Sequence, residues 1–397
     1  MKIMKKGIII IAALAIVSCQ NDSELKLELN ENSGNIPFTF NAFSNKATKA
    51  NSTSLNDFYT TFNVYGWKSF DNGTTWETTN PVFNNVTNEY FAADGNGTVV
   101  YATGDPVSTE WGTIQSPSAF PGWYYENIRY WDKYATNYQF SAYTPITASA
   151  EVTCTPDGKI LIGTDGSKVT VDNTNLMAAP NTALAYTGFL KDYMTAKSNV
   201  KTSAVNLVFS HELSKINVKL VLNTSVTTPQ DVIVKEVSIK HLKGTSYYDS
   251  SNESATGYLT GWKTPVDELA YTVKGVSGAE TGYKMNGTTA GTDKFSGYYV
   301  MERLMIPQTI EKNTAKADQL ADMTQACVYV EYTIGDQTYK GHYALANLFI
   351  GTGAETTYDF LGGNEYTLTI NVGPTPIYFT TEVTAWTNHD ATDLIAN

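Results

Sequence analysis

The sequence has few of the residues on which metal and redox sites depend. Its 397 residues include three cysteines and four histidines. No two of these stand at the short spacing that zinc ligands require, so a zinc site has no support. Only Cys154 and Cys327 lie far from the N-terminus, which excludes a disulfide-rich scaffold. These two can form one long-range disulfide or remain two buried thiols, and the sequence leaves both possibilities open.

Basic charge is also scarce. The formal net charge is −12, charged residues make up 17% of the chain, and the only arginines are Arg129 and Arg303. A basic stripe for nucleic acid is therefore absent. A polybasic segment that would attract the chain to anionic lipid is absent as well.

Motifs that resemble catalytic or metal-binding sequences are present but incomplete. Ser277 lies in Gly-Val-Ser-Gly, which lacks the last glycine of a nucleophile elbow. The turn at residues 94–97 begins like a calcium loop but lacks the later oxygen ligands. His211 stands alone in a strand-like region, where a structural role is favoured over catalysis. We therefore expect no enzyme activity, no cofactor and no metal site.

The N-terminus has the pattern of an export signal. A basic start is followed by a short uncharged apolar run from Gly7 to Ile16, which predicts a signal peptide over residues 1–18. This run is too short for a membrane-spanning helix, which needs roughly 20 residues. It ends at Ile16-Val17-Ser18-Cys19, which resembles the lipobox of bacterial lipoproteins and predicts lipidation, including palmitate, at Cys19. An ordinary cleavage site with an incidental cysteine is the alternative.

The body of the chain is predicted to be all-β. Tyrosine and glycine are abundant, with 26 and 29 residues, and short apolar runs alternate with turn pairs such as Asn72-Gly73. This rhythm favours two tandem β-sandwich domains, at residues 50–200 and 201–397, after a propeptide at 19–49. One ambiguous helical piece lies at 318–323. The clearest strand-like runs are 58–64, 138–143, 159–162, 184–187, 205–209, 215–222, 232–242, 298–306, 328–334, 337–345 and 365–372.

Two strand-like segments near the ends of the chain carry an apolar residue at almost every second position. The first spans residues 36–42 and the second spans 376–386. A period of two is typical of a half-buried strand. At about 3.3 Å per residue the stretch from Ile377 to Ala385 would extend roughly 30 Å, enough to pair along a sheet edge. The apolar residues are Ile36, Phe38, Phe40 and Ala42 in the first, and Ile377, Phe379, Val383 and Ala385 in the second.

An aromatic cluster in the first half allows two interpretations. Exposed tryptophan and tyrosine rings can stack on sugar rings, which would make a glycan site. The rings can also fill the first core and its loops, and the sequence favours this second interpretation. The cluster consists of Trp111, Phe120, Trp123, Tyr124, Tyr125, Tyr130 and Trp131.

Motifs along almost the whole chain together resemble the fimbrillins, the subunits of type V pili in Gram-negative anaerobes. None of them is specific alone, but their order and spacing match that family. They are the lipobox at Cys19, the first strand with Thr48-Lys49-Ala50, Phe62-Asn63-Val64-Tyr65-Gly66, Tyr130-Trp131 with residues 138–145, Phe209-Ser210-His211-Glu212-Leu213-Ser214-Lys215-Ile216, Asn364-Glu365-Tyr366-Thr367-Leu368 and Val383-Thr384-Ala385-Trp386.

The resemblance implies two transthyretin-like sandwiches and a route of assembly. Fimbrillins are anchored in the outer membrane by their lipid, and a trypsin-like protease then cuts the loop after the first strand. The C-terminal strand of a neighbouring subunit is thought to fill the groove left behind. The matching loop here has no arginine, so cleavage is expected after Lys49 or after Lys46.

The implied partners are other fimbrial subunits, a processing protease, the outer membrane, and host or bacterial surface ligands. An uncleaved anchor or minor subunit is one alternative. A monomeric surface lipoprotein that binds glycan through the aromatic cluster is another.

Overall fold

The computed structural model confirms the all-β class. Most of the described residues form strands, and the one α-helix among them is α1 (Leu345–Ile350). No helix in this part of the chain is long and apolar enough to cross a bilayer. The described residues are 38–44, 53–54, 61–93, 99–101, 122–125, 127, 129–171, 194–198, 204–222, 232–252, 261–274, 283–284, 298–313, 324–373 and 377–385.

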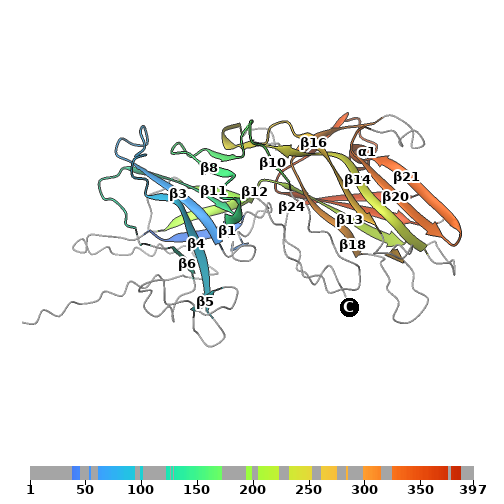
Figure 1. The fold of residues 1–397 in the computed structure, drawn as a ribbon, viewed down its shortest axis with the longest axis horizontal. Helices are drawn as coiled ribbons and strands as arrows, with labels where there is room; N and C mark the ends of the chain where they lie inside the picture. Colours follow the sequence, from blue (N-terminus) through green and yellow to red (C-terminus); the bar gives the residue numbers. More distant parts are fainter. Residues whose placement is uncertain are drawn as a thin grey trace, which may run out of the picture.

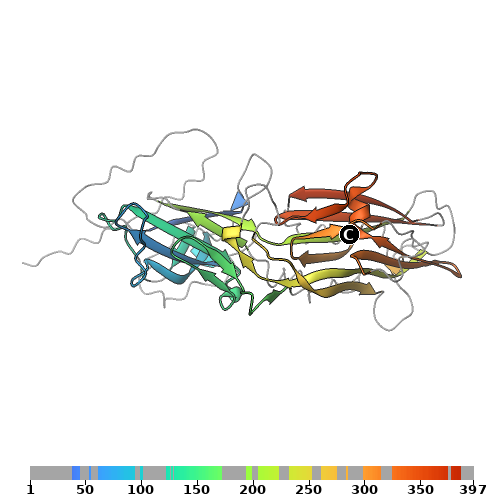
Figure 2. The same ribbon diagram turned by 90° about the horizontal axis from the view of Figure 1, so that it is seen from above.

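The molecule is elongated, with two lobes that follow one another along its long axis (Figures 1 and 2). The first lobe is built around a nine-stranded sheet with the order β2-β1-β12-β11-β7-β3-β4-β5, in which β6 also pairs with β4. Its strands are β1 (Phe40–Ser44), β2 (Thr53–Ser54), β3 (Thr61–Ser69), β4 (Phe83–Ala93), β5 (Val99–Tyr101), β6 (Gly122–Tyr125), β7 (Asn137–Thr144), β11 (Met194–Ser198) and β12 (Val205–His211).

Two sheets pack face to face in the second lobe, as in a sandwich. One has the order β10-β14-β20-β21 with β16 and β17 also on β14, and the other has the order β18-β13-β23-β24. Inward residues of β13 and β23 meet those of β14 and β20 in one apolar core. The strands are β10 (Val169–Thr170), β13 (Ser214–Leu222), β14 (Val232–Ser246), β16 (Val266–Lys274), β17 (Tyr283–Lys284), β18 (Tyr298–Met305), β20 (Cys327–Ile334), β21 (Gln337–Ala344), β23 (Asn364–Val372) and β24 (Tyr378–Ala385), beside the pair β19 (Gln308–Glu311) and β22 (Thr357–Phe360).

The two lobes are interlocked by strands that cross between them. From the first half of the chain, β10 pairs with β14. From the second half, β15 (Tyr248–Asp249) pairs with β9 (Ile160–Ile162), which also pairs with β8 (Val152–Cys154). The short 3-10 helices η2 (Ile146–Ala148) and η3 (Ser250–Asn252) follow β7 and β15. One apolar core combines residues of both halves, with Tyr143 and Ile160 beside Trp262 and Leu304.

The first sheet continues past the predicted domain boundary at residue 200. β12 follows that boundary, yet it pairs with β1 and β11. Val205, Leu207 and Phe209 on β12 are buried in the same core as Phe40, which explains why this strand belongs to the first lobe. The division into two tandem domains stays a prediction. The predicted signal peptide and the helical piece at 318–323 lie outside the described residues.

Candidate functional site

The first strand is an integral part of the first core. Phe38, Phe40 and Ala42 alternate along it and are 2%, 4% and 2% exposed. Asn41, between them, is exposed and its amide donates to Asn206 at 2.9 Å. The predicted period of two is therefore confirmed for these positions. Ile36, the fourth apolar residue of the prediction, lies outside the described residues.

The backbone of this strand is bonded on both sides. β1 runs parallel to β12 in continuous register, from Phe40 opposite Val205 to Ser44 opposite Phe209. On its other side it pairs with the short β2. Just before β1, the Phe38 N–H donates to the Arg129 carbonyl at 2.9 Å. β1 thus closes the core from near the edge of the nine-stranded sheet.

Aromatic rings surround the two phenylalanines. The ring of Phe38 lies 4.1 Å from that of Trp131 and 5.3 Å from that of Phe83. The ring of Phe40 lies 5.3 Å from Phe83 and 5.7 Å from Tyr125. The neighbours of each ring come from other strands and loops of the lobe. Loss of residues 38–42 would therefore uncover two spaces of aromatic size, at Phe38 and Phe40, and a small one at Ala42.

The predicted C-terminal strand is present as β24 at the edge of its sheet. It pairs antiparallel with β23, from Tyr378 opposite Asn371 to Ala385 opposite Asn364. No other described strand pairs with its outer edge. Ile377 and Phe379 are partly buried against the second core, whereas Val383 is 46% exposed. The strand is docked on its own subunit, with its apolar side only half covered.

Several predicted site residues cannot be placed. Cys19, Lys46 and Lys49 lie outside the described residues, so lipidation and cleavage stay predictions. Trp111 and Phe120 of the aromatic cluster lie outside them too. Trp123 is only partly exposed, with its ring 4.7 Å from that of Phe62. The ring of Trp131 is tilted against that of Phe38, and both indoles pack on the core as the favoured interpretation expects.

The three histidines that the structure describes are not gathered into one site. His211 is 5% exposed at the end of β12, and the ring of His342 lies 4.6 Å from that of Tyr329. His241 Nδ1 lies 2.7 Å from Glu268 Oε2 in an exposed pair. In the described part of the chain no three His, Cys, Asp or Glu side chains are placed to hold a metal ion. Ser277, His389 and residues 94–97 are outside it.

The two internal cysteines are free and buried in different places. Cys154 belongs to the core shared by the lobes, and Cys327 contacts Ala344 in the second lobe. Of the two possibilities that the sequence allows, the structure thus contains two buried thiols. Burial raises the pKa of Cys154 to about 12 and raises that of Cys327 above its usual value.

Both thiols are expected to be inert in the folded protein. The raised pKa values keep them protonated near neutral pH, and the thiolate is the reactive form. In a Cys19→Ser variant, an aromatic disulfide reagent should release no coloured thiol until denaturant is added, and then two equivalents. Rapid release of one equivalent from the folded chain would contradict the burial described here.

A known protein family matches the chain over most of its length. A family model described as fimbrillin-like matches residues 48–386. No curated protein sequence matches the chain. Among solved structures, a fimbrial protein from Bacteroides vulgatus is 14% identical with a TM-score of 0.47, over 88% of this chain and 99% of that one. The tip fimbrial protein Mfa3 from Porphyromonas gingivalis, with C-terminal truncation, is 11% identical with a TM-score of 0.40, over 89% and 100%.

A fimbrial assembly protein from Parabacteroides distasonis is also similar, with 11% identity and a TM-score of 0.32 over 89% of this chain and all of that one. With TM-scores below 0.5, these three likenesses add nothing to the assignment, which rests on the family model. That model spans most of the 397 residues and includes β3 to β24. The chain therefore belongs to the fimbrillin-like family and is a fimbrial protein of the cell surface.

Proposed function

We propose that the chain is a non-enzymatic structural subunit of a fimbria that polymerises by strand exchange. The observation that carries the proposal is the position of β1, whose alternate side chains fill the first core. Its main pairing partner, β12, lies some 165 positions later in the sequence, as in the pair Phe40 and Val205. A strand held in this way can be replaced by another chain segment with the same alternation.

Proteolysis between β1 and β2 would separate the first strand from the rest of the subunit. β1 ends at Ser44 and β2 begins at Thr53, and Lys46 and Lys49 lie between them in the sequence. The family model begins at residue 48, so the matched region starts after β1. Before the cut, lipid on Cys19 would anchor the precursor in the outer membrane, with residues 19–49 as the propeptide.

The donor in this proposal is the C-terminal strand of a neighbouring subunit. Its residues Ile377, Phe379, Val383 and Ala385 have the alternation that the groove requires. Leaving its own sheet costs that strand its pairing with β23, and the new ladder hydrogen bonds replace it at about 0.5–1.5 kcal/mol each. Burial favours the exchange further, since Val383 is 46% exposed where it now lies. Complete burial of such a side chain contributes about 1.5–3 kcal/mol.

The test compares the wild-type protein with the double variant Lys46→Ala/Lys49→Ala on the surface of the cell. Sheared wild-type protein should begin at Ala50, or at Ala47, and should give an SDS-resistant ladder on a heated, unreduced gel. The double variant should retain residues 36–42 and run as a monomer. N-terminal sequencing and intact mass distinguish the two.

The variant Lys26→Ala, with a lysine removed before the first strand, serves as the matched control and should be processed like the wild type. Assembled pili that still contain residues 36–42 would overturn the cleavage step. A wild-type monomer that begins at lipid-bearing Cys19 would favour an uncleaved anchor subunit or a glycan-binding lipoprotein instead.

A further inference from the structure

Residue 38 is bonded through both of its backbone groups to one neighbouring segment. The Phe38 N–H donates to the Arg129 carbonyl at 2.9 Å, and the Phe38 carbonyl accepts from the Tyr125 hydroxyl at 3.0 Å. The next residue is bonded to β12 instead, because the Thr39 carbonyl accepts from the Val205 N–H at 2.8 Å. The first strand is therefore held from two sides at this point. We call the Tyr125 hydroxyl and the Arg129 carbonyl the backbone clamp.

The Tyr125 hydroxyl is held in place by the packing of its ring in the first core. This ring lies 5.7 Å from that of Phe40 and 5.1 Å from that of Phe83. The hydroxyl oxygen also accepts from the Arg129 N–H at 3.4 Å. Burial raises the pKa of Tyr125 to about 12, so the hydroxyl keeps the proton that it donates to the Phe38 carbonyl.

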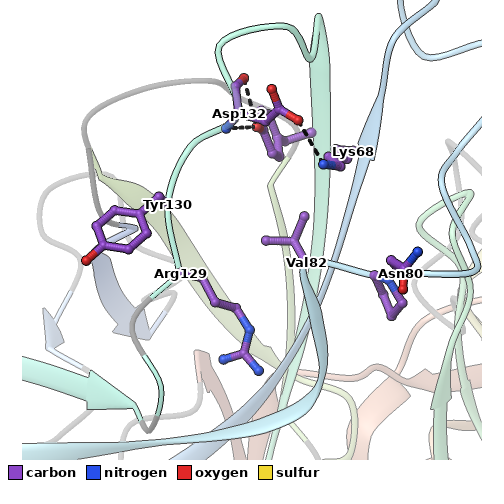
Figure 3. A pocket seen from close by; sticks show the side chains of 8 residues that line it. Lys68, Asn80, Val82, Arg129, Tyr130 and Asp132 are labelled. Atoms are coloured by element: carbon purple, nitrogen blue, oxygen red, sulfur yellow. Dashed lines mark hydrogen bonds and ion pairs between the residues drawn. The ribbon is translucent and has the colours of Figure 1, made fainter. Parts of the chain in front are cut away.

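The loop that carries Arg129 is anchored to the lobe by contacts of its own. The Arg129 guanidinium lies over the Phe83 ring, 5.0 Å from its centroid. Farther along, Asp132 Oδ2 lies 2.8 Å from Lys68 Nζ on β3, and the Asp132 N–H donates to the Tyr138 hydroxyl at 2.6 Å. Figure 3, which looks into the pocket beside this loop, shows Arg129 and the joined pair of Lys68 and Asp132. Because none of these contacts involves the first strand, the clamp keeps its place when that strand is lost.

A clamp that bonds only to backbone groups accepts strands of different sequence. Every residue except proline offers the same N–H and C=O groups, so the groups that hold Phe38 can hold another residue in its position. The two spaces of aromatic size, at Phe38 and Phe40, determine which side chains fit. Ile377 and Phe379 of the C-terminal strand are both large and are likewise two positions apart. They therefore match these spaces.

We propose that Tyr125 is a positioning residue for strand exchange, with the Arg129 carbonyl as the second part of the clamp. In the precursor it holds the first strand. After processing it bonds to the backbone of the neighbouring subunit's donor strand, with Ile377 and Phe379 in the two spaces of aromatic size. This inference rests on the proposed strand exchange and adds the contact that fixes the position of the donor along the groove.

The first measurement uses the unprocessed chain, in which the clamp acts on its own first strand. Tyr125→Phe keeps the ring and removes only the hydroxyl. Amide hydrogen exchange at residues 38–44, followed by mass spectrometry, should be about tenfold faster in this variant. Tenfold corresponds to about 1.4 kcal/mol, which is within the usual contribution of one hydrogen bond. Exchange in β14 of the second lobe should not change. Equal exchange at residues 38–44 in the variant and the wild type would overturn the clamp.

The second measurement uses fimbriae sheared from cells. The SDS-resistant ladder of Tyr125→Phe subunits should dissociate at a lower temperature than the wild-type ladder, because each junction lacks the bond from the hydroxyl. The matched control is Tyr143→Phe, whose hydroxyl bonds to Asn63 and Asn85 in the same lobe. Its ladder should dissociate at the wild-type temperature. Thermal unfolding of both unprocessed variants checks that they fold.

The outcomes distinguish this proposal from the strand exchange on which it rests. A wild-type protein that gives no ladder would contradict strand exchange itself and would reject the role of Tyr125 in assembly as well. A wild-type ladder whose resistance is unchanged in Tyr125→Phe would leave strand exchange standing and reject the clamp. An equal loss of resistance in Tyr143→Phe would show a general effect on stability and would also reject the clamp.

Discussion

Replacing Phe40 with alanine is expected to lower the free energy of unfolding by about 3–5 kcal/mol, the usual cost of this change in a packed core. Phe40 is 4% exposed and touches Phe62, Phe83 and Tyr125 from other strands. Alanine would leave a cavity that these rings cannot close without moving. Urea unfolding of the unprocessed chain, followed by tryptophan fluorescence, should show a lower midpoint.

The matched control is Asn41→Ala, on the outward side of the same strand. Its loss removes the exposed hydrogen bond to Asn206, which is worth about 0.5–1.5 kcal/mol. An equal decrease in the free energy of unfolding of both variants would show that the inward side chains do not hold β1 in place. The strand-exchange proposal would then lose the side-chain sites on which it depends.

A second large effect is expected from Glu365→Ala in the second lobe. Glu365 and Lys215 lie opposite each other on the parallel strands β23 and β13, with 1% and 0% of their side chains exposed. Their charged atoms are 3.9 Å apart, and the Asn217 amide donates to Glu365. Loss of the carboxylate would leave the Lys215 charge in the interior without this partner. Removal of one member of a buried pair typically costs 3–5 kcal/mol.

Glu268→Ala is the corresponding change in an exposed pair. Glu268 lies 2.8 Å from Lys243 and 2.7 Å from His241, and its side chain is 46% exposed. Surface pairs contribute about 0–1 kcal/mol because water screens them. Chemical unfolding of both variants should therefore separate them clearly. A loss as small in Glu365→Ala as in Glu268→Ala would mean that Lys215 finds compensation elsewhere.

The alternation of apolar residues predicted the strands well wherever one face is buried. The predicted runs at 138–143, 215–222 and 365–372 correspond to β7, β13 and β23. The runs at 328–334 and 337–345 correspond to the hairpin of β20 and β21, with Gly335 and Asp336 between them. These strands have a core on at least one side, so side-chain period and burial agree. The buried positions of the first strand were found for the same reason.

Other elements carried no such signal. β4 (Phe83–Ala93) was missed because Asn84, Asn85 and Asn88 interrupt it, and Asn85 has a positive φ of 55°. The run predicted to reach Leu345 as a strand was wrong at its end, since that residue begins α1. Strand β3 continues past residue 64, where the predicted run ended. Its register shifts between Val64 and Gly66, and Gly66 leaves room there for the rings of Phe83 and Phe140.

Some residues of the candidate sites could likewise be predicted from the sequence, and others could not. Phe38 and Phe40 could be singled out because alternation is local information. The bond from Tyr125 to the Phe38 carbonyl could not, because the two residues are 87 positions apart in the sequence.

The crossing strands between the lobes determine how the subunit responds to mechanical load. A flexible linker between domains acts as a hinge under tension. Here, in contrast, β10 pairs with β14 and β15 pairs with β9, and in each pair the two strands come from different halves of the chain. A pull along the long axis must shear these pairs and open the core around Tyr248 and Trp262. We therefore expect each subunit to bend as one stiff rod, so that a filament of such rods would flex at the junctions between neighbours.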